Sequence, residues 1–250
     1  MNSPEARELI PRPAGETVPS SALLSALTTE HYTLQSARSA TIVEANGRSS
    51  LFLSAVSGAL VALALVAQLD RLGETFLVFA FSVLPALLIL GLMSYTRLAD
   101  LAVHDAYYAR AIGRIRSFYL DIAGPDARRY WLLGAGDDAQ AVMRHAGQRL
   151  TTWHHWTHQA TAVAAVTAVI AGVLSGLAID TATSLTLPGT AVVGVAVAVL
   201  LLVALLADQG RRWRLSGQRS PSLFAPDGAL HAAAPGDLHE VGAVPAACHP

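Results

Sequence analysis

Residues 107–119, which read YYARAIGRIRSFY, combine three arginines with four aromatic residues. The candidate binding residues in this stretch are Arg110, Arg114, Arg116 and Tyr119. Guanidinium groups form paired hydrogen bonds with phosphate oxygens, and several on one helix would act together. The pattern therefore predicts a recognition surface for an anionic lipid or a nucleotide ligand. The alternative is a solvated basic face beside an anionic membrane leaflet.

A second cluster, WHHWTH at residues 153–158, combines histidines with tryptophans. On a helix His154 and His158 lie one turn apart, so they could share a metal ion or face haem iron. Most metal sites need three or four ligands, and this pair supplies two. The alternative is an interfacial belt, in which Trp153 and Trp156 anchor the chain at the level of the lipid headgroups. We expect the belt, with no metal and no other cofactor.

The sequence has no motif of a common enzyme class, since it contains no P-loop, nucleophile elbow or zinc-protease signature. Its single cysteine, Cys248, excludes an intramolecular disulfide and a cysteine-based metal cluster. We therefore predict that the protein is not an enzyme, and we expect no nucleic-acid partner.

Four apolar runs flank these candidate sites, at residues 49–69, 75–96, 160–179 and 190–207. None contains Asp, Glu, Arg or His, and each has about 20 residues, which matches a hydrocarbon core of ~30 Å. The chain is 53% hydrophobic and 14% charged, whereas a soluble domain has about 25% charged residues. The sequence predicts an all-α integral membrane protein whose four transmembrane helices form two hairpins, with long cytoplasmic helical extensions.

The distribution of arginine predicts the orientation in the membrane. All 17 basic residues are arginines: four precede the first run, eight lie between the second and third, and four follow the fourth. Only Arg71 lies in one of the two expected outer loops, at residues 70–74 and 180–189. Because cytoplasmic loops carry the excess of basic residues, both termini and the central segment should be cytoplasmic. The absence of lysine suggests a GC-rich bacterial genome, so we expect a multi-pass protein of the bacterial inner membrane, embedded in its lipid bilayer.

These features divide the chain into six segments. We expect a disordered tail at 1–20, a cytoplasmic helix at 21–48, a first transmembrane hairpin at 49–96, a cytoplasmic helical insert at 97–159, a second transmembrane hairpin at 160–207, and a basic segment with a disordered tail at 208–250. Apolar residues recur at helical spacing after the second run, so its helix should continue to residue 120. Gly124 and Pro125 should end it, and Asp126 should cap a short turn that follows.

Small residues four positions apart predict close packing of membrane helices. The candidate pairs are Ser54 with Gly58 in the first run and Gly172 with Gly176 in the third, and such pairs also suit a homo-oligomer. Pro85 should kink the second membrane helix because it removes one backbone hydrogen bond. The residues expected to anchor the chain in the headgroup layer after the fourth run are Arg211, Arg212, Trp213 and Arg214.

Glu44 and Arg48 place a carboxylate and a basic residue four positions apart, directly before the first hairpin. In this pattern residues 37–96 resemble Pycsar-type and SLATT-type membrane effectors, small helical-hairpin proteins of bacteria associated with nucleotide-signalled antiphage defence. The resemblance implies a role in perturbing the membrane. Pycsar-type proteins usually carry Asp and Lys at these positions, where this chain has Glu and Arg. The whole chain is also similar to uncharacterised actinobacterial four-span membrane proteins, which implies no activity.

The uncharged membrane spans bear on function, because proton and ion carriers usually place ionisable residues inside the membrane. We therefore predict a non-enzymatic sensor, effector or scaffold that receives its signal or its partner on the cytoplasmic helices. Two alternatives stay open. One is a channel or transporter component, including a pore formed by several copies, and the other is a metal- or haem-binding membrane protein.

Overall fold

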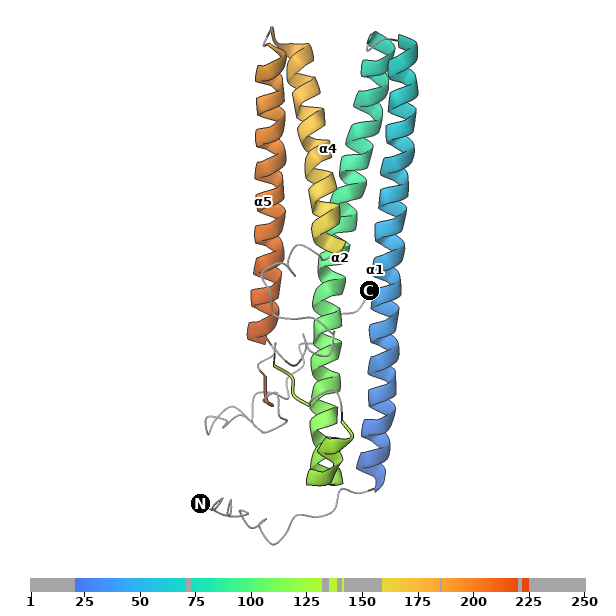
Figure 1. The fold of residues 1–250 in the computed structure, drawn as a ribbon, viewed down its shortest axis with the longest axis vertical. Coiled ribbons are helices and arrows are strands. Elements are labelled where there is room, and N and C mark those ends of the chain that lie inside the picture. Colours follow the sequence, from blue (N-terminus) through green and yellow to red (C-terminus); the bar gives the residue numbers. More distant parts are fainter. Residues whose placement is uncertain are drawn as a thin grey trace, which may run out of the picture.

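The described residues of the chain fold into four long helices and one short 3-10 helix, as its computed structural model shows (Figure 1). The structure describes residues 21–70, 73–131, 135–138, 141, 159–184, 186–219 and 222–224. Helix α1 spans Ser21–Asp70, α2 spans Glu74–Ala123, the 3-10 helix η1 spans Pro125–Arg129, α4 spans Gln159–Ala182 and α5 spans Leu187–Arg219. Within the described residues no β-strand element occurs. The predicted all-α fold is confirmed.

The four long helices form two antiparallel hairpins that stand side by side (Figure 1). Helix α1 pairs with α2, α4 pairs with α5, and the hairpins join mainly where α4 packs on α2. Helices α1 and α2 then continue together beyond the ends of the second hairpin. We call the parts of α1 and α2 outside their apolar runs, residues 21–48 and 97–123, the arm.

Each of the four long helices is long and apolar enough to cross a membrane, and each contains one of the four apolar runs. This arrangement is that of a multi-pass membrane protein. Helices α1 and α2 have 50 residues each, which corresponds to ~75 Å at ~1.5 Å per residue. Since the hydrocarbon core of a bilayer is only ~30 Å thick, the arm extends out of it.

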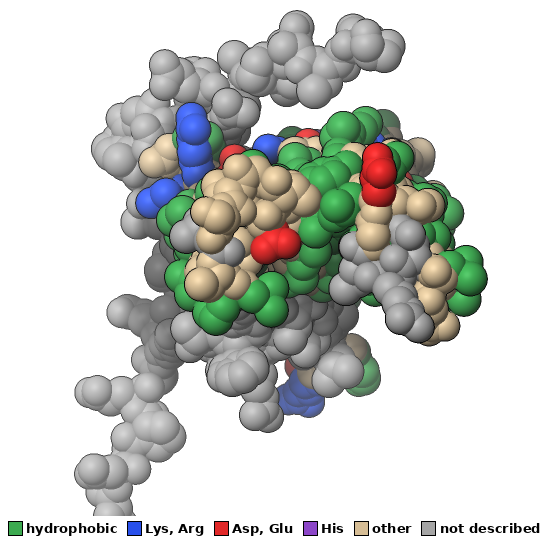
Figure 2. Space-filling view, turned by 90° about the horizontal axis from the view of Figure 1, so that it is seen from above, with side chains coloured by type: hydrophobic (Ala, Val, Ile, Leu, Met, Phe, Trp, Pro, Cys, Tyr) green, Lys and Arg blue, Asp and Glu red, His purple; other side chains and the backbone are tan. Residues whose placement is uncertain are grey.

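The end of the molecule that carries the two interhelical turns is apolar on its flanks (Figure 2). Hydrophobic side chains line much of the visible edge of the described helices, and isolated acidic side chains lie on top. The acidic residues next to these turns include Glu74, at the start of α2, and Asp180, near the end of α4. A flank with so little charge suits contact with lipid.

The two hairpins meet around Gly91 of α2. Phe52 of α1 is only 1% exposed, and its ring lies beside Gly91 together with the side chain of Thr167 from α4. A Cβ atom on Gly91 would overlap the Thr167 side chain. Thr167 is itself buried, and its hydroxyl donates to the carbonyl oxygen of Val163 at 2.7 Å. The missing side chain of Gly91 therefore lets three helices approach at one point.

Gly172 and Gly176 both face α5, in agreement with the close packing that their spacing suggests. A Cβ atom added to Gly172 would lie 2.5 Å from the carbonyl oxygen of Gly194, and one added to Gly176 would lie 3.4 Å from that of Thr190. Helices α4 and α5 thus pack backbone against backbone at these positions.

Ser54 and Gly58, the other pair with this spacing, do not pack between the described helices. Both residues are exposed, and a Cβ atom on Gly58 would meet nothing within 4 Å. The reason is helical phase, since the core-facing residues of α1 here are Phe52, Ala55 and Val56. At 3.6 residues per turn, Ser54 and Gly58 lie on the opposite side of the helix.

The loop that joins α4 to α5 is shorter than the predicted range of 180–189. Helix α4 continues to Ala182 and α5 begins at Leu187. Pro188 fits the first turn of α5 because that turn needs no backbone N–H donor from it. Pro85, by contrast, lies inside α2, which continues through it.

Helix α2 ends at the predicted Gly124–Pro125 break. Gly124 adopts a φ angle of 78°, which favours glycine, and its N–H donates to the carbonyl oxygen of Leu120 at 3.1 Å. The 3-10 helix η1 follows with Gly124 as its N-cap. Asp126 lies inside η1 and does not cap it, which corrects the prediction for that residue.

Candidate functional site

The arm is a two-helix coiled coil with polar residues in its seam. Along α1 the less exposed positions recur at alternating steps of four and three residues, as a heptad pattern requires. These positions are Leu27, His31, Leu34, Arg38, Thr41 and Ala45. From α2, Ile112 and Ile115 are buried, as their spacing predicts. The seam therefore contains a histidine and an arginine where a coiled coil usually has apolar side chains.

Arg38 enters the seam as an ion pair with Asp105 of α2. Its Nε atom donates to Oδ1 at 2.8 Å and its Nη2 atom donates to Oδ2 at 3.3 Å. Two parallel hydrogen bonds of this kind fix both the charge and the orientation of the guanidinium. Arg38 is thus neutralised by its own partner helix.

Arg116 lies near Arg38 but has no such partner. In the part of the chain that the structure describes, no carboxylate forms an ion pair with Arg116. Its side chain is partly buried, and this burial lowers the pKa of the guanidinium, with a further lowering from the positive charge of Arg38. A partly buried cation without an anion is unfavourable. The position therefore attracts a negatively charged group.

His31 approaches Arg116 from α1. Its ring lies edge-on to the ring of Tyr119, with the centroids 5.7 Å apart. Gln35 places its amide nitrogen 2.9 Å from Nε2 of His31, so this ring nitrogen accepts the hydrogen bond and the neutral ring carries its proton on Nδ1. Nδ1 is buried and has no hydrogen-bond partner among the described residues. We call His31, Arg38, Arg116 and Tyr119 the arm cluster.

The protonation state of His31 depends on its surroundings. Burial lowers the pKa of His31 below its ordinary value of 6.5, and the charge of Arg116 lowers it further. The ring is therefore neutral at pH 7. Tyr119, the fourth member of the cluster, places its hydroxyl 3.4 Å from Oγ1 of Thr28 across the two helices.

Arg110 and Arg114 are bound to another part of the chain, whereas we expected their guanidinium groups to be available for a ligand. Nε of Arg114 donates to Oδ2 of Asp137 at 2.6 Å, and Nε of Arg110 donates to the Asp137 carbonyl oxygen at 2.9 Å. Asp137 is 0% exposed. Its Oδ1 atom accepts hydrogen bonds from the backbone N–H groups of Leu223 and Phe224, at 2.9 and 2.8 Å. Through Asp137, these two arginines therefore hold residues 135–138 and residues 222–224 on α2.

One of the expected membrane anchors on α5 also has an internal role. Nε of Arg212 donates to Oδ2 of Asp208 at 2.7 Å, and Nη1 donates to Oδ1 of Asp100 on α2. Arg212 thus ties α5 to α2. Arg211 and Arg214 are exposed, and Trp213 is partly exposed.

The expected histidine–tryptophan belt, with Trp153, Trp156, His154 and His158, lies outside the described residues. Among the residues that the structure does describe, no group of three or more His, Cys, Asp or Glu side chains is arranged to hold a metal ion.

The sequence pattern missed His31, Arg38 and Asp137. A signal for the first two exists, because His31 and Arg38 each lie four residues after a leucine of the seam, Leu27 and Leu34. A heptad pattern drawn through these leucines would have placed both polar residues against α2. No comparable signal marks Asp137, which follows two glycines outside any long helix.

The arm cluster offers positive charge and hydrogen-bond donors at the contact of two helices, an arrangement that suits the binding of an anion. Its contributors come from positions far apart in the chain, His31 and Arg38 on α1 and Arg116 and Tyr119 on α2. No family model, no curated protein and no solved structure matches this chain.

Proposed function

We propose that the protein is a non-enzymatic sensor or effector of the bacterial inner membrane that binds a soluble phosphate-bearing ligand, such as a nucleotide, at the arm cluster. The observation that carries this proposal is Arg116, a partly buried cation with no carboxylate partner among the described residues. Phosphate oxygens are the acceptors that guanidinium groups bind best. The arginine distribution favours an orientation with the arm in the cytoplasm, where such ligands occur.

The distance of Arg116 from the membrane favours a soluble ligand over a lipid headgroup. Arg116 lies 20 residues after Thr96, the last residue of the second apolar run, on one continuous helix. At ~1.5 Å per residue this is ~30 Å along the helix axis. The polar layer on each side of a bilayer is only about 5–8 Å thick. A headgroup could reach Arg116 only if the arm lay almost flat on the membrane.

The continuity of α1 and α2 gives a route from the ligand to the membrane. Both helices pass without a break from the arm cluster into their apolar runs. Polar residues in a coiled-coil seam reduce its stability and set its register. An anion at Arg116 would change the charge balance of this seam, and the attached membrane helices would move with it. The resemblance of residues 37–96 to nucleotide-associated membrane effectors supports the same proposal.

We expect the substitution Arg116→Gln to weaken the binding of a soluble phosphodiester probe by about 10- to 100-fold, because a hydrogen bond to a charged group contributes about 1.5–3 kcal/mol. The measurement is a titration of the full chain in detergent with a panel of cyclic mononucleotides and cyclic dinucleotides. Arg129→Gln is the matched control, since Arg129 is exposed and its Nη2 atom lies 3.9 Å from Oδ1 of the equally exposed Asp126, in a long and weak ion pair. It should bind like the parent.

Two results would contradict the proposal. In one, the parent binds none of the soluble probes but binds phosphatidylglycerol vesicles, which would make the arm a lipid-contacting surface. In the other, Arg116→Gln binds the probe as tightly as Arg129→Gln, which would make Arg116 a structural residue of the coiled coil.

The binding of such a probe should also tighten as the pH falls. Arg116 lowers the pKa of His31, and an anion bound to Arg116 would offset that charge and raise the pKa of His31. By linkage, protonation of His31 and anion binding then favour each other. A phosphodiester keeps its charge between about pH 7.5 and pH 5.5, so a change in affinity over this range reports on the protein. His31→Gln should abolish this increase in affinity. If the affinity of the variant still rises at low pH as that of the parent does, His31 is not linked to anion binding.

A further inference from the structure

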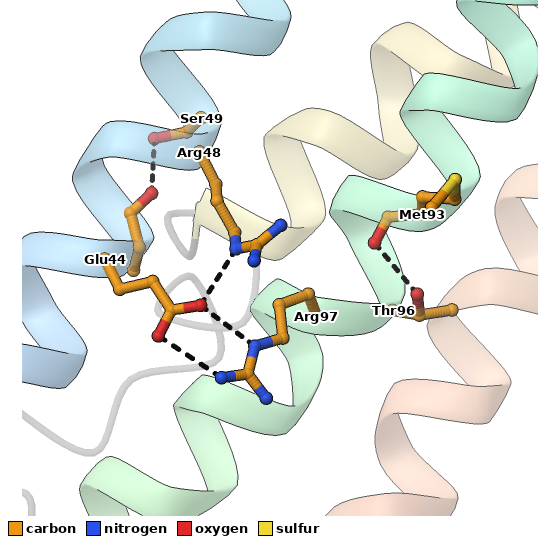
Figure 3. A network of polar contacts seen from close by, with 7 residues as sticks. Glu44, Arg48, Ser49, Met93, Thr96 and Arg97 are labelled. Carbon is orange, nitrogen blue, oxygen red and sulfur yellow. Dashed lines mark hydrogen bonds and ion pairs between the residues drawn. The ribbon is translucent and has the colours of Figure 1, made fainter. Parts of the chain in front are cut away.

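A second group of charged side chains lies where the arm meets the apolar runs. Glu44 of α1 accepts hydrogen bonds from Arg48 of the same helix and from Arg97 of α2 (Figure 3). Oε1 of Glu44 lies 2.9 Å from Nε of Arg48 and 3.0 Å from Nε of Arg97, and its Oε2 lies 3.2 Å from Nη2 of Arg97. We call these three residues the collar cluster.

The collar cluster carries an excess of positive charge. Hydrogen bonds from Arg97 and then from Arg48 lower the pKa of Glu44, so its carboxylate stays ionised beside two cations. The next carboxylate that acts on Arg97 is Asp100, which is itself paired with Arg212. The three residues together therefore have one uncompensated positive charge.

The two arginines also have hydrogen-bond donors left over. A guanidinium carries five N–H groups, and the bonds to Glu44 use one from Arg48 and two from Arg97. The side chains of Arg48 and Arg97 are 46% and 44% exposed. Unused donors of both arginines can therefore be reached from outside the helix pair.

The cluster lies at the level where the lipid headgroups begin. Arg48 directly precedes the first apolar run, and Arg97 directly follows the second. Leu51, three residues after Arg48, is 73% exposed, and Met93, four residues before Arg97, is 66% exposed. Residues three or four apart share one face of a helix. Exposed apolar side chains thus adjoin the arginines on the membrane side.

We propose that the collar cluster binds the phosphodiester of one anionic membrane lipid, with the acyl chains lying along Leu51 and Met93. The unused guanidinium donors hydrogen-bond the phosphate oxygens, and the excess charge selects an anionic lipid over a zwitterionic one. A carboxylate from a soluble protein would satisfy the same donors but would leave the adjoining apolar side chains uncovered, whereas a lipid satisfies the donors and covers these side chains. This site is separate from the arm cluster, and it would fix the depth of the arm in the membrane.

The proposal is tested by the retention of phosphatidylglycerol on the full chain, measured by native mass spectrometry after release from micelles that contain equal amounts of phosphatidylglycerol and phosphatidylcholine. The parent should retain phosphatidylglycerol in preference. Arg48→Gln and Arg97→Gln should each lower its retention about fivefold, because one basic residue near the membrane surface contributes about 1 kcal/mol. The control is Arg129→Gln, an exposed arginine beyond the end of α2 and away from the apolar runs, which should change retention less than twofold.

Glu44→Gln distinguishes a lipid site from a simple tie between helices. Loss of the carboxylate removes the competitor for the guanidinium donors, so retention of phosphatidylglycerol should stay at the parent level or rise. A fall as large as that of the arginine variants would show that the cluster only joins α1 to α2, and the proposal would fail. Exposed ion pairs contribute only about 0–1 kcal/mol, so all these variants should fold, and their melting temperatures verify this.

Two further results would overturn the proposal. Equal losses for Arg48→Gln, Arg97→Gln and Arg129→Gln would indicate general attraction of the lipid by basic residues. Displacement of phosphatidylglycerol by millimolar inorganic phosphate would indicate a site for free phosphate instead of a lipid. Neither result affects the titration of the Arg116 variant with soluble probes, so the proposals for the arm cluster and for the collar cluster are tested independently.

Discussion

Replacing Gly172 by leucine should destabilise the second hairpin by about 1–3 kcal/mol, a typical cost of overpacking a close contact. A Cβ atom at this position would lie 2.5 Å from the carbonyl oxygen of Gly194 and 2.9 Å from Cβ of Ala198. Neither the backbone nor Ala198 can turn away as a long side chain would, so α4 and α5 must separate. For a chain of this size the melting temperature in detergent should fall by about 2–12 °C.

The matched control is Gly58→Leu, which makes the same change in the first hairpin. A Cβ atom at Gly58 meets nothing within 4 Å, so this variant should melt within about 1 °C of the parent. Gly194→Leu should behave like Gly172→Leu, because its Cβ atom would lie 2.8 Å from the carbonyl oxygen of Gly172. Equal melting temperatures for Gly58→Leu and Gly172→Leu would contradict the backbone-to-backbone packing of α4 on α5.

Replacing Asp137 by alanine should have the larger effect, about 3–5 kcal/mol, because it removes one partner of a buried ion pair. The change leaves Arg114 and the backbone N–H groups of Leu223 and Phe224 without the carboxylate that binds them. The expected result is release of residues 222–224 from α2. Hydrogen exchange of the Leu223 and Phe224 amides measures this release directly, beside the melting temperature.

Asp126→Ala controls for the loss of a carboxylate near the end of α2, since its side chain is 86% exposed and it should leave both readouts unchanged. Asp137→Asn should give an intermediate result, because its amide oxygen can still accept the two backbone hydrogen bonds while the charge is lost. Parent-like protection of Leu223 and Phe224 in Asp137→Ala would show that other contacts hold this segment.

The sequence by itself predicts the four helices and their arrangement in two hairpins. Hydrophobicity is a local property, and an uncharged run of about 20 residues has few structural choices, because a spanning segment must satisfy its own backbone hydrogen bonds. The continuation of α2 into the arm is equally local, since Ile112 and Ile115 repeat the helical spacing and lie in its buried face. The end of α2 at Gly124 likewise depends only on neighbouring residues.

The partners of these helix faces were decided by the tertiary structure alone. Ser54 with Gly58 and Gly172 with Gly176 have the same spacing, yet only the second pair faces another described helix, because spacing identifies a helix face but not the neighbour that covers it. Arg114 has its partner 23 residues away in Asp137, on a segment that no periodic pattern places. Pairing of that kind follows from how the chain returns to α2, and this is a property of the whole fold.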